Sequence, residues 1–247
     1  MSLNGKTAIV TGAGRDIGRA CAVRLAEAGV KVAVNYFASS QGADETVAEI
    51  KAAGGEAFAL AGDLTRAEDA AELVRRTHET FGAIDILVNN AGGLIARKTM
   101  AEMTLDHWNA VMDLNLTSTF HMIKAVLPHM TSGAIINIAS QAARDGGGPG
   151  AVAYATSKGA VATMTRGLAK ELGPRIRVNA LCPGMIDTDF HNIHTQPEVR
   201  VKVEAATPLK RQGTSRDVAN AVAYLASDEA AFITGANIDI NGGTLFS

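Results

Sequence analysis

The sequence that decides the fold is KTAIVTGAGRDIGRACAVRLAEA, residues 6–28. An apolar run passes through the turn Thr11-Gly12-Ala13-Gly14-Arg15-Asp16-Ile17-Gly18 into a helical pattern. Glycines in such a turn let the backbone approach a pyrophosphate, whose charge the N-terminus of the next helix favours. The same turn can also be purely structural, and Gly18 comes one residue later than the G-x-G-x-x-G fingerprint requires. The segment therefore predicts a strand, a turn and a helix, and indicates a dinucleotide site.

Short apolar runs alternate with longer amphipathic runs from this segment onward, which is typical of a parallel sheet covered by helices. We expect strands at residues 6–13, 30–36, 56–63, 85–90, 133–140, 175–181 and 236–240. We expect helices at residues 17–28, 41–53, 66–81, 105–130, 154–172 and 215–227, the last with a cap at Thr214 or Ser215. The predicted fold class is α/β: one domain over residues 1–247, a Rossmann-type, doubly wound, parallel seven-stranded sheet with helices on both faces.

Two segments match neither pattern. Residues 141–150 are rich in glycine, and residues 189–212 are polar and contain Pro197 and Pro208. Long irregular segments in a compact domain are more often functional than filler. We therefore expect a loop at about residues 189–212 that acts as a substrate lid.

Composition excludes several classes of protein. The chain has 23 Lys and Arg against 25 Asp and Glu, so it lacks the basic excess that nucleic-acid binding requires. Cys21 and Cys182 lie far apart in apolar surroundings, and the histidines form no ligand set, so we expect reduced thiols and no metal site. A secretory signal and a membrane-spanning apolar run are also missing, so we expect a cytoplasmic protein without a membrane segment.

The end of the second expected strand bears on the choice of cofactor. NAD-binding sheets usually carry an Asp or Glu there, about 20 residues beyond the glycine turn, to bind the ribose. Here Asn35 is followed by Ser39 and Ser40, and no carboxylate appears before Asp44. Arg15 could pair with a 2′-phosphate, which favours NADP(H) over NAD(H), although it could also be a solvated surface charge. Asp63, after the third strand, either accepts from an adenine amino group or caps a turn.

Tyr154 and Lys158 carry the strongest chemical signal. Their spacing of four residues puts both on one face of a helix, where an ammonium can lower the pKa of a phenol that is otherwise about 10. Such a pair also occurs on ordinary amphipathic helices. Residues 89–92 and Ser140 end two other expected strands, and ligands in open α/β sheets bind at the carboxyl ends of the strands. We therefore expect these residues at one crevice.

Together, and in this order along the chain, these motifs resemble the short-chain dehydrogenase/reductase family: Thr11-Gly12 to Gly18, Asn89-Asn90-Ala91-Gly92, Asn115, Ser140, Tyr154, Lys158 and Pro183-Gly184. The resemblance covers essentially the whole chain and is greatest to the 3-oxoacyl-[acyl-carrier-protein] reductase group. It implies that Tyr154 is the general acid/base, and that Lys158 lowers the pKa of Tyr154 and binds the nicotinamide ribose. It also implies that Ser140 orients the substrate oxygen and that Asn115 holds a water linking Lys158 to solvent.

The expected function is hydride transfer between NADP(H) and a ketone or secondary alcohol, with a 3-oxoacyl-type substrate that could be carrier-bound. Small residues on the helix at 154–172 and the resemblance together imply a homotetramer. The expected cofactor-binding residues are Gly12, Gly14, Arg15, Ile17, Gly18, Asn35, Ser39, Ser40, Asp63, Leu64, Asn90, Ala91, Gly92, Tyr154, Lys158, Pro183, Gly184, Ile186 and Thr188.

Two departures from the family pattern and two alternatives accompany this interpretation. Asp16 replaces the middle glycine of the turn, where we interpret it as a helix N-cap, and the loop from Ser140 to Tyr154 is one residue longer than expected. The first alternative is an NAD-dependent sugar or polyol dehydrogenase of the same family. The second is a non-catalytic dinucleotide-binding redox sensor, which would not need an intact set of catalytic residues.

Overall fold

The computed structural model describes residues 3–246 and contains the predicted parallel sheet. Seven strands lie in the order β3-β2-β1-β4-β5-β6-β7. Every neighbouring pair is parallel. The strands are β1 (Thr7–Val10), β2 (Lys31–Tyr36), β3 (Ala57–Ala61), β4 (Ile86–Asn89), β5 (Gly133–Ile138), β6 (Ile176–Pro183) and β7 (Asn237–Ile240). All carboxyl ends therefore meet at one edge, where polar side chains follow the buried strands.

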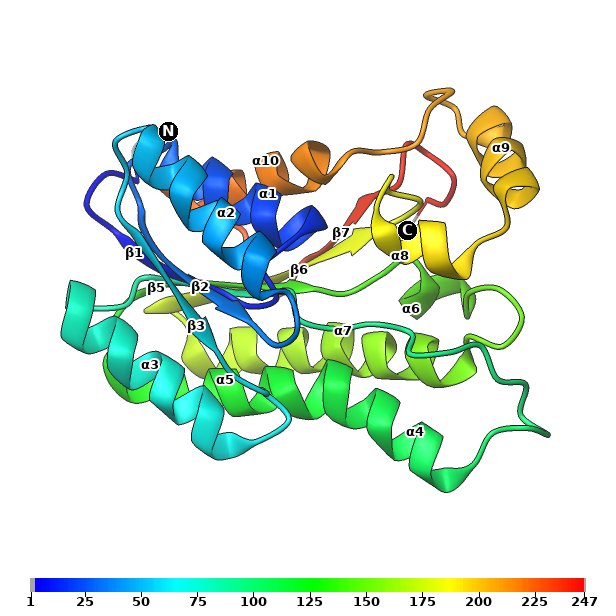
Figure 1. Cartoon of the computed structure of the whole chain (residues 1–247), viewed down its shortest axis with the longest axis horizontal. Coiled ribbons are helices and arrows are strands. Elements are labelled where there is room, and N and C mark those ends of the chain that lie inside the picture. Colours follow the sequence, from blue (N-terminus) through cyan, green and yellow to red (C-terminus); the bar gives the residue numbers. More distant parts are fainter. Residues whose placement is uncertain (1–2, 247) are drawn as a thin grey trace.

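Helices cover both faces of the sheet (Figure 1). One face carries α1 (Asp16–Ala26), α2 (Ser40–Ala52) and α10 (Ser215–Ala226); the other carries α3 (Ala67–Phe81), α4 (Leu105–Met112), α5 (Ser118–Val126) and α7 (Val152–Leu172). Strand β1 shows how the sheet serves both layers, because Ala8 and Val10 pack into the core on the α1 side while Ile9 packs into the opposite core. The single-domain Rossmann-type prediction is confirmed.

Local signals set several helix boundaries. Thr214 forms a capping box with Asp217 at the start of α10, as the sequence predicts. The helix expected at 105–130 is interrupted by a π-helical turn at Asp113–Thr117, which separates α4 from α5, and it ends in a 3-10 turn at Leu127–His129. A second 3-10 turn at Asp228–Ala230 follows α10.

Both unassigned segments contain helices. Residues 141–150 contain the short helix α6 (Ala142–Asp145), and residues 189–212 contain α8 (Asp189–His194) and α9 (Pro197–Ala206). The expectation of a loop at 189–212 is therefore wrong. Pro197 lies in the first turn of α9, where proline is favoured, rather than breaking the segment. None of the helices formed by residues 3–246 is long and apolar enough to span a membrane.

Candidate active site

The ends of β1 and β4 are joined by hydrogen bonds. The Thr11 hydroxyl accepts from the backbone N–H groups of Asn90 and Ala91, both at 2.9 Å. The Asn90 side-chain amide donates to the carbonyls of Thr11 at 2.9 Å and Gly12 at 3.1 Å. Thr11 and Asn90 therefore fix the glycine turn against β4, a role that uses up the Asn90 amide.

Close packing explains the glycines of this turn. Gly12 has φ +60°, in the left-handed region, and a Cβ on Gly18 would lie 2.3 Å from the Gly12 carbonyl oxygen. A Cβ on Gly14 would lie 2.8 Å from the Ser39 carbonyl oxygen, which brings the start of α2 beside the turn. Ile17, in the first turn of α1, packs on the core. A side chain at Gly14 or Gly18 would therefore collide with neighbouring backbone atoms.

Asn35, at the end of β2, is hydrogen-bonded to the glycine turn. Asn35 is buried; its Oδ1 accepts from the Gly12 N–H at 3.3 Å and its Nδ2 donates to the Gly62 carbonyl at 3.3 Å. Because its polar atoms bond within the protein, Asn35 supports the glycine turn rather than presenting a free group. The Ser39 hydroxyl lies 3.5 Å from the Gly14 carbonyl, and Ser40 is exposed beside it.

Asp63 and Leu64 follow β3. The Asp63 Oδ1 accepts from both the backbone N–H of Thr65 at 3.0 Å and its hydroxyl at 2.7 Å, which is the turn-capping arrangement. Leu64 is buried, and its carbonyl lies 3.1 Å from the His121 ring nitrogen Nδ1.

Asn115 and Lys158 meet at Gly92. Asn115 is fully buried in the π-helical turn, where its side-chain amide donates to the Gly93 carbonyl and accepts from the Gly93 N–H, at 2.9 and 3.0 Å. A Cβ on Gly92 would lie 2.5 Å from the Asn115 Oδ1 and 3.0 Å from the Lys158 Nζ. The backbone carbonyl of Asn115 accepts from the Thr119 hydroxyl at 2.9 Å. Residues from β4, the π turn and α7 therefore converge on one point.

Lys158 is buried, and its ammonium donates to the Ile138 carbonyl at 2.8 Å. Burial lowers the pKa of Lys158 from 10.5 to about 8. The pKa of Tyr154 is raised, chiefly by burial, while the Ser140 side chain acts in the opposite direction. The Lys158 Nζ lies 5.9 Å from the centre of the Tyr154 ring, and its hydrogen bond is directed to the backbone of β5.

Ser140 and Phe190 flank Tyr154. The Ser140 hydroxyl accepts from the Ala142 N–H at 3.1 Å, which holds it at the end of β5. The Phe190 ring, on α8, packs against the Tyr154 ring with their centres 5.7 Å apart. Sequence reasoning missed Phe190, although its position two residues after Thr188 is a usable signal.

The segment after β6 lies along the same edge. The Gly184 N–H donates to Ile240 at 3.0 Å, and a Cβ on Gly184 would lie 2.7 Å from that of Asn241. Ile186 is buried and pairs with Gly213, and the Thr188 hydroxyl donates to the Ile186 carbonyl at 3.1 Å. Pro183, Gly184, Ile186 and Thr188 thus form one ordered path from β6 to α8.

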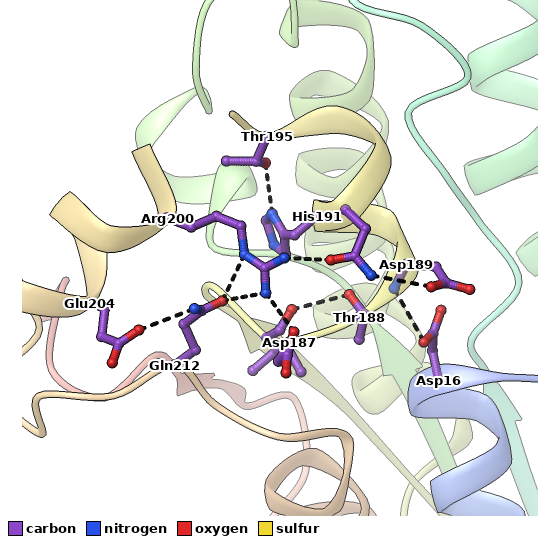
Figure 2. A network of polar contacts seen from close by, with 11 residues as sticks. Asp16, Asp187, Thr188, Asp189, His191, Thr195, Arg200, Glu204 and Gln212 are labelled. Carbon is purple, nitrogen blue, oxygen red and sulfur yellow. Dashed lines mark hydrogen bonds and ion pairs between the residues drawn. The ribbon is translucent and has the colours of Figure 1, made fainter. Parts of the chain in front are cut away.

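Arg15 and Asp16 contact α8 directly (Figure 2 shows the Asp16 contact). The exposed Arg15 guanidinium lies 3.2 Å from the Asp189 carboxylate, and the Asp16 Oδ1 accepts from the Asp189 N–H at 3.3 Å. No side chain caps α1, so the N-cap interpretation of Asp16 is wrong. Burial raises the pKa of Asp16.

Arg97 is a second residue that sequence reasoning missed. Its guanidinium donates to the backbone carbonyls of His194 at 2.9 Å and Pro149 at 2.8 Å. It thereby ties the loop after β4 to the end of α8 and to the loop after α6. No local pattern marks Arg97, because all these contacts are distant in sequence.

The residues at this edge suit a dinucleotide. The first turn of α1 has no side-chain cap, so its N–H groups are free to face a phosphate, and the glycine turn presents backbone rather than side chains. Lys158 and Tyr154 lie near one another at the same edge of the sheet, and the Phe190 ring packs against Tyr154. The Asp16 carboxylate, and the Asp189 carboxylate beside it, carry charges that oppose a pyrophosphate.

Comparison with known proteins agrees with this geometry. The family model described as "Enoyl-(Acyl carrier protein) reductase" matches residues 12–244. The chain is 42% identical over 242 residues to 3-oxoacyl-[acyl-carrier-protein] reductase FabG of Staphylococcus epidermidis, covering 96% of this chain and 98% of the relative. It is 44% identical over 249 residues to the 3-oxoacyl-[acyl-carrier-protein] reductase of Synechocystis sp., covering 98% of each. It is also 40% identical over 249 residues to glucose 1-dehydrogenase 2 of Bacillus subtilis, covering 98% of this chain and 95% of the relative.

Solved structures give the same class. A dehydrogenase/reductase from Sinorhizobium meliloti superposes with a TM-score of 0.93 at 39% identity, covering 98% of this chain and 96% of the other. A 7α-hydroxysteroid dehydrogenase complexed with NADH gives 0.94 at 36% identity, with 98% and 95% covered. A blue fluorescent protein from a metagenomic library, in complex with NADPH, gives 0.93 at 38% identity, with both chains fully covered at 100%. The chain belongs to the short-chain dehydrogenase/reductase family of oxidoreductases.

Proposed function

We propose that the chain is an NADP(H)-dependent reductase that converts a 3-oxoacyl-type ketone to a secondary alcohol. The observation that carries this is the convergence of Ser140, Tyr154 and Lys158 at the edge where the glycine turn lies. Two hydroxyls beside one another suit a single carbonyl oxygen. The relatives named as 3-oxoacyl-[acyl-carrier-protein] reductases support the substrate class, including a carrier-bound form.

The proton chemistry falls to Tyr154 and Ser140. The Tyr154 hydroxyl donates its proton to the substrate oxygen as that oxygen becomes an alkoxide, and the Ser140 hydroxyl donates a hydrogen bond to the same oxygen. When bound, NADP(H) supplies the hydride. Lys158 would exchange its bond to Ile138 for the nicotinamide ribose, which holds the reacting carbon near Tyr154. Asn115 fixes the backbone beside Lys158, where a water could link Lys158 to solvent.

In the reductive direction Tyr154 has to carry a proton before it can donate one. Burial raises the pKa of its phenol, so the hydroxyl carries this proton at neutral pH.

Cofactor preference follows from the end of β2. Arg15, Ser39 and Ser40 lie beside the turn, and no carboxylate occurs in residues 35–40 at the end of β2, which supports NADP(H). Neighbouring structures were solved with NADPH and with NADH, so the comparisons leave both cofactors open.

We further propose that the protein is a homotetramer, that it is located in the cytoplasm, and that α8–α9 form the substrate lid. The contact of Phe190 with Tyr154 supports the last of these proposals.

A matrix of substrates and cofactors tests the proposal. Purified protein is incubated with a 3-oxoacyl thioester, a simple ketone or an aldose, each with both cofactors, and the nicotinamide absorbance is followed. The expected result is fastest reduction of the 3-oxoacyl thioester with NADPH, lost in Tyr154→Phe. Preferred oxidation of the aldose with NAD would instead establish the sugar-dehydrogenase alternative. Tight cofactor binding without turnover would establish the sensor.

A further inference from the structure

Asp16 adopts a backbone conformation that costs energy in a residue with a side chain. Its φ is +50°, in the left-handed region, where glycine is preferred and aspartate is one of the better-tolerated alternatives. The side chain does not cap α1, although it stands at the first position of that helix. It points instead across to the start of α8 (Figure 2), where its Oδ1 accepts from the Asp189 N–H at 3.3 Å.

Asp189 has a backbone donor available for this contact. Within α8 the first backbone bonds run from the N–H groups of His191 and Asn192 to the Thr188 carbonyl, so the helix does not use the Asp189 N–H. The Asp189 carboxylate is held in turn by Arg15, 3.2 Å away. Two consecutive residues of the glycine turn therefore hold one residue of α8, through its backbone and its side chain.

The contact extends from Asp189 into both lid helices. The Asn192 amide donates to the Asp189 carboxylate at 3.3 Å, and the Arg200 guanidinium, on α9, donates to the Asn192 side chain. Arg200 also donates to Gln212 at 2.8 Å and to Asp187. Figure 2 shows this continuous network, which joins α8, α9 and the two ends of the segment. Asp189 is therefore connected by side-chain hydrogen bonds to both α8 and α9.

We propose that Asp16 is a positioning residue that holds the α8–α9 lid against the glycine turn. We call its hydrogen bond to the Asp189 N–H the latch. The proposal rests on the proposed function, because it treats α8–α9 as the lid of the substrate site. Phe190 is next to Asp189 and packs on the Tyr154 ring, so the latch sets the position of the Phe190 ring beside the catalytic phenol. Glycine at position 16 could form the same turn with less strain, but it could not bond to α8.

Hydrogen exchange tests the latch without requiring turnover. Peptide-resolved exchange is measured on the unliganded full chain for wild type, Asp16→Gly and Asp16→Asn. Loss of the acceptor in Asp16→Gly should speed exchange across α8 and α9 by about twofold to tenfold, the net value of one hydrogen bond. Asp16→Asn retains an acceptor oxygen and should exchange like wild type, and α10 should be unchanged in all three. Equal exchange in all three proteins, or equal acceleration in both variants, would overturn the latch.

Substitutions of Asp189 give an independent test of its hydrogen bond with Asp16. Asp189 begins α8 and follows Thr188, whose φ of −155° and ψ of 163° suit a residue before proline. Asp189→Ala removes only the carboxylate, whereas Asp189→Pro also removes the N–H that Asp16 accepts. Faster exchange in the proline variant than in the alanine variant supports the hydrogen bond, and identical exchange refutes it.

Kinetics then connect the latch to catalysis. In Asp16→Gly the KM for the ketone should rise about twofold to tenfold relative to Asp16→Asn, because both variants lose the charge near the pyrophosphate but only one loses the latch. An unchanged KM ratio would refute the positioning role. If no ketone is reduced by any of the proteins, the proposed function fails, while the exchange measurements still decide whether the latch exists.

Discussion

Replacing Lys158 with methionine should stabilise the unliganded protein while abolishing activity. The buried ammonium loses hydration on folding, which lowers its pKa from 10.5 to about 8 and corresponds to a penalty of about 3 kcal/mol at neutral pH. Methionine keeps most of the side-chain volume without the charge. It also leaves the Ile138 carbonyl without its donor, which costs about 1 kcal/mol. The expected net gain in the free energy of unfolding is about 2 kcal/mol at about pH 7.

The difference in stability between wild type and Lys158→Met should change with pH in a definite direction. Between a folded pKa of about 8 and an unfolded pKa of 10.5, the unfolded chain still holds the Lys158 proton that the folded chain has released. Wild-type stability therefore rises with pH in this window relative to Lys158→Met, and the advantage of the variant shrinks by about 3 kcal/mol across it.

Urea unfolding at matched protein concentration, at several values from about pH 7 to pH 10, measures this difference. Lys170→Met is the control, because Lys170 is an exposed lysine on the same helix and its loss should change stability little at any pH. A difference between wild type and Lys158→Met that stays constant with pH, or a variant that is less stable near neutrality, would refute the reasoning.

Four further outcomes are expected. Tyr154→Phe should lower kcat by about 100-fold while NADPH still binds, as measured by turnover and by cofactor titration. Arg15→Ala should lower the ratio of NADPH to NADH affinity by about tenfold, and an unchanged ratio would make Arg15 only a surface charge. Gly18→Ala should cost about 2 kcal/mol or more in thermal or urea unfolding, because its Cβ would lie 2.3 Å from the Gly12 carbonyl and 2.6 Å from the Asn90 amide. Light scattering should give about four times the chain mass of 25.6 kDa; a monomer would contradict the tetramer.

Much of the fold could be predicted because its signals are local or periodic. Each strand is a short apolar run, and the order of strands and helices along the chain allows few arrangements other than a parallel sheet. The cap at Thr214 depends only on Asp217, three residues away. The π turn at Asn115 escaped prediction because an apolar face continues through it, and the interruption depends on a buried amide bonded to Gly93, 22 residues earlier.

The helical structure of residues 189–212 escaped prediction for a different reason. In the sequence Pro197 suggests an interruption, although in the first turn of a helix its fixed φ and missing N–H cost nothing. The six residues of α8 are too few for a periodic signal. Their position depends on contacts with the glycine turn, and Asp16 and Asp189 lie 173 residues apart. Sequence reasoning identified Asp16 as unusual but could not name its partner.

The Arg15 contact connects α8 to the proposed preference for NADP(H). The Arg15 guanidinium is paired with Asp189, so a 2′-phosphate would have to compete with that carboxylate. The pair is exposed and therefore worth about 0–1 kcal/mol, whereas a charge-assisted contact to a phosphate is worth about 1.5–3 kcal/mol. The exchange of partners favours NADPH, but by less than the full phosphate contact would provide. It would also remove one of the two bonds between the turn and Asp189, so that the bond from Asp16 would be the remaining one of that pair.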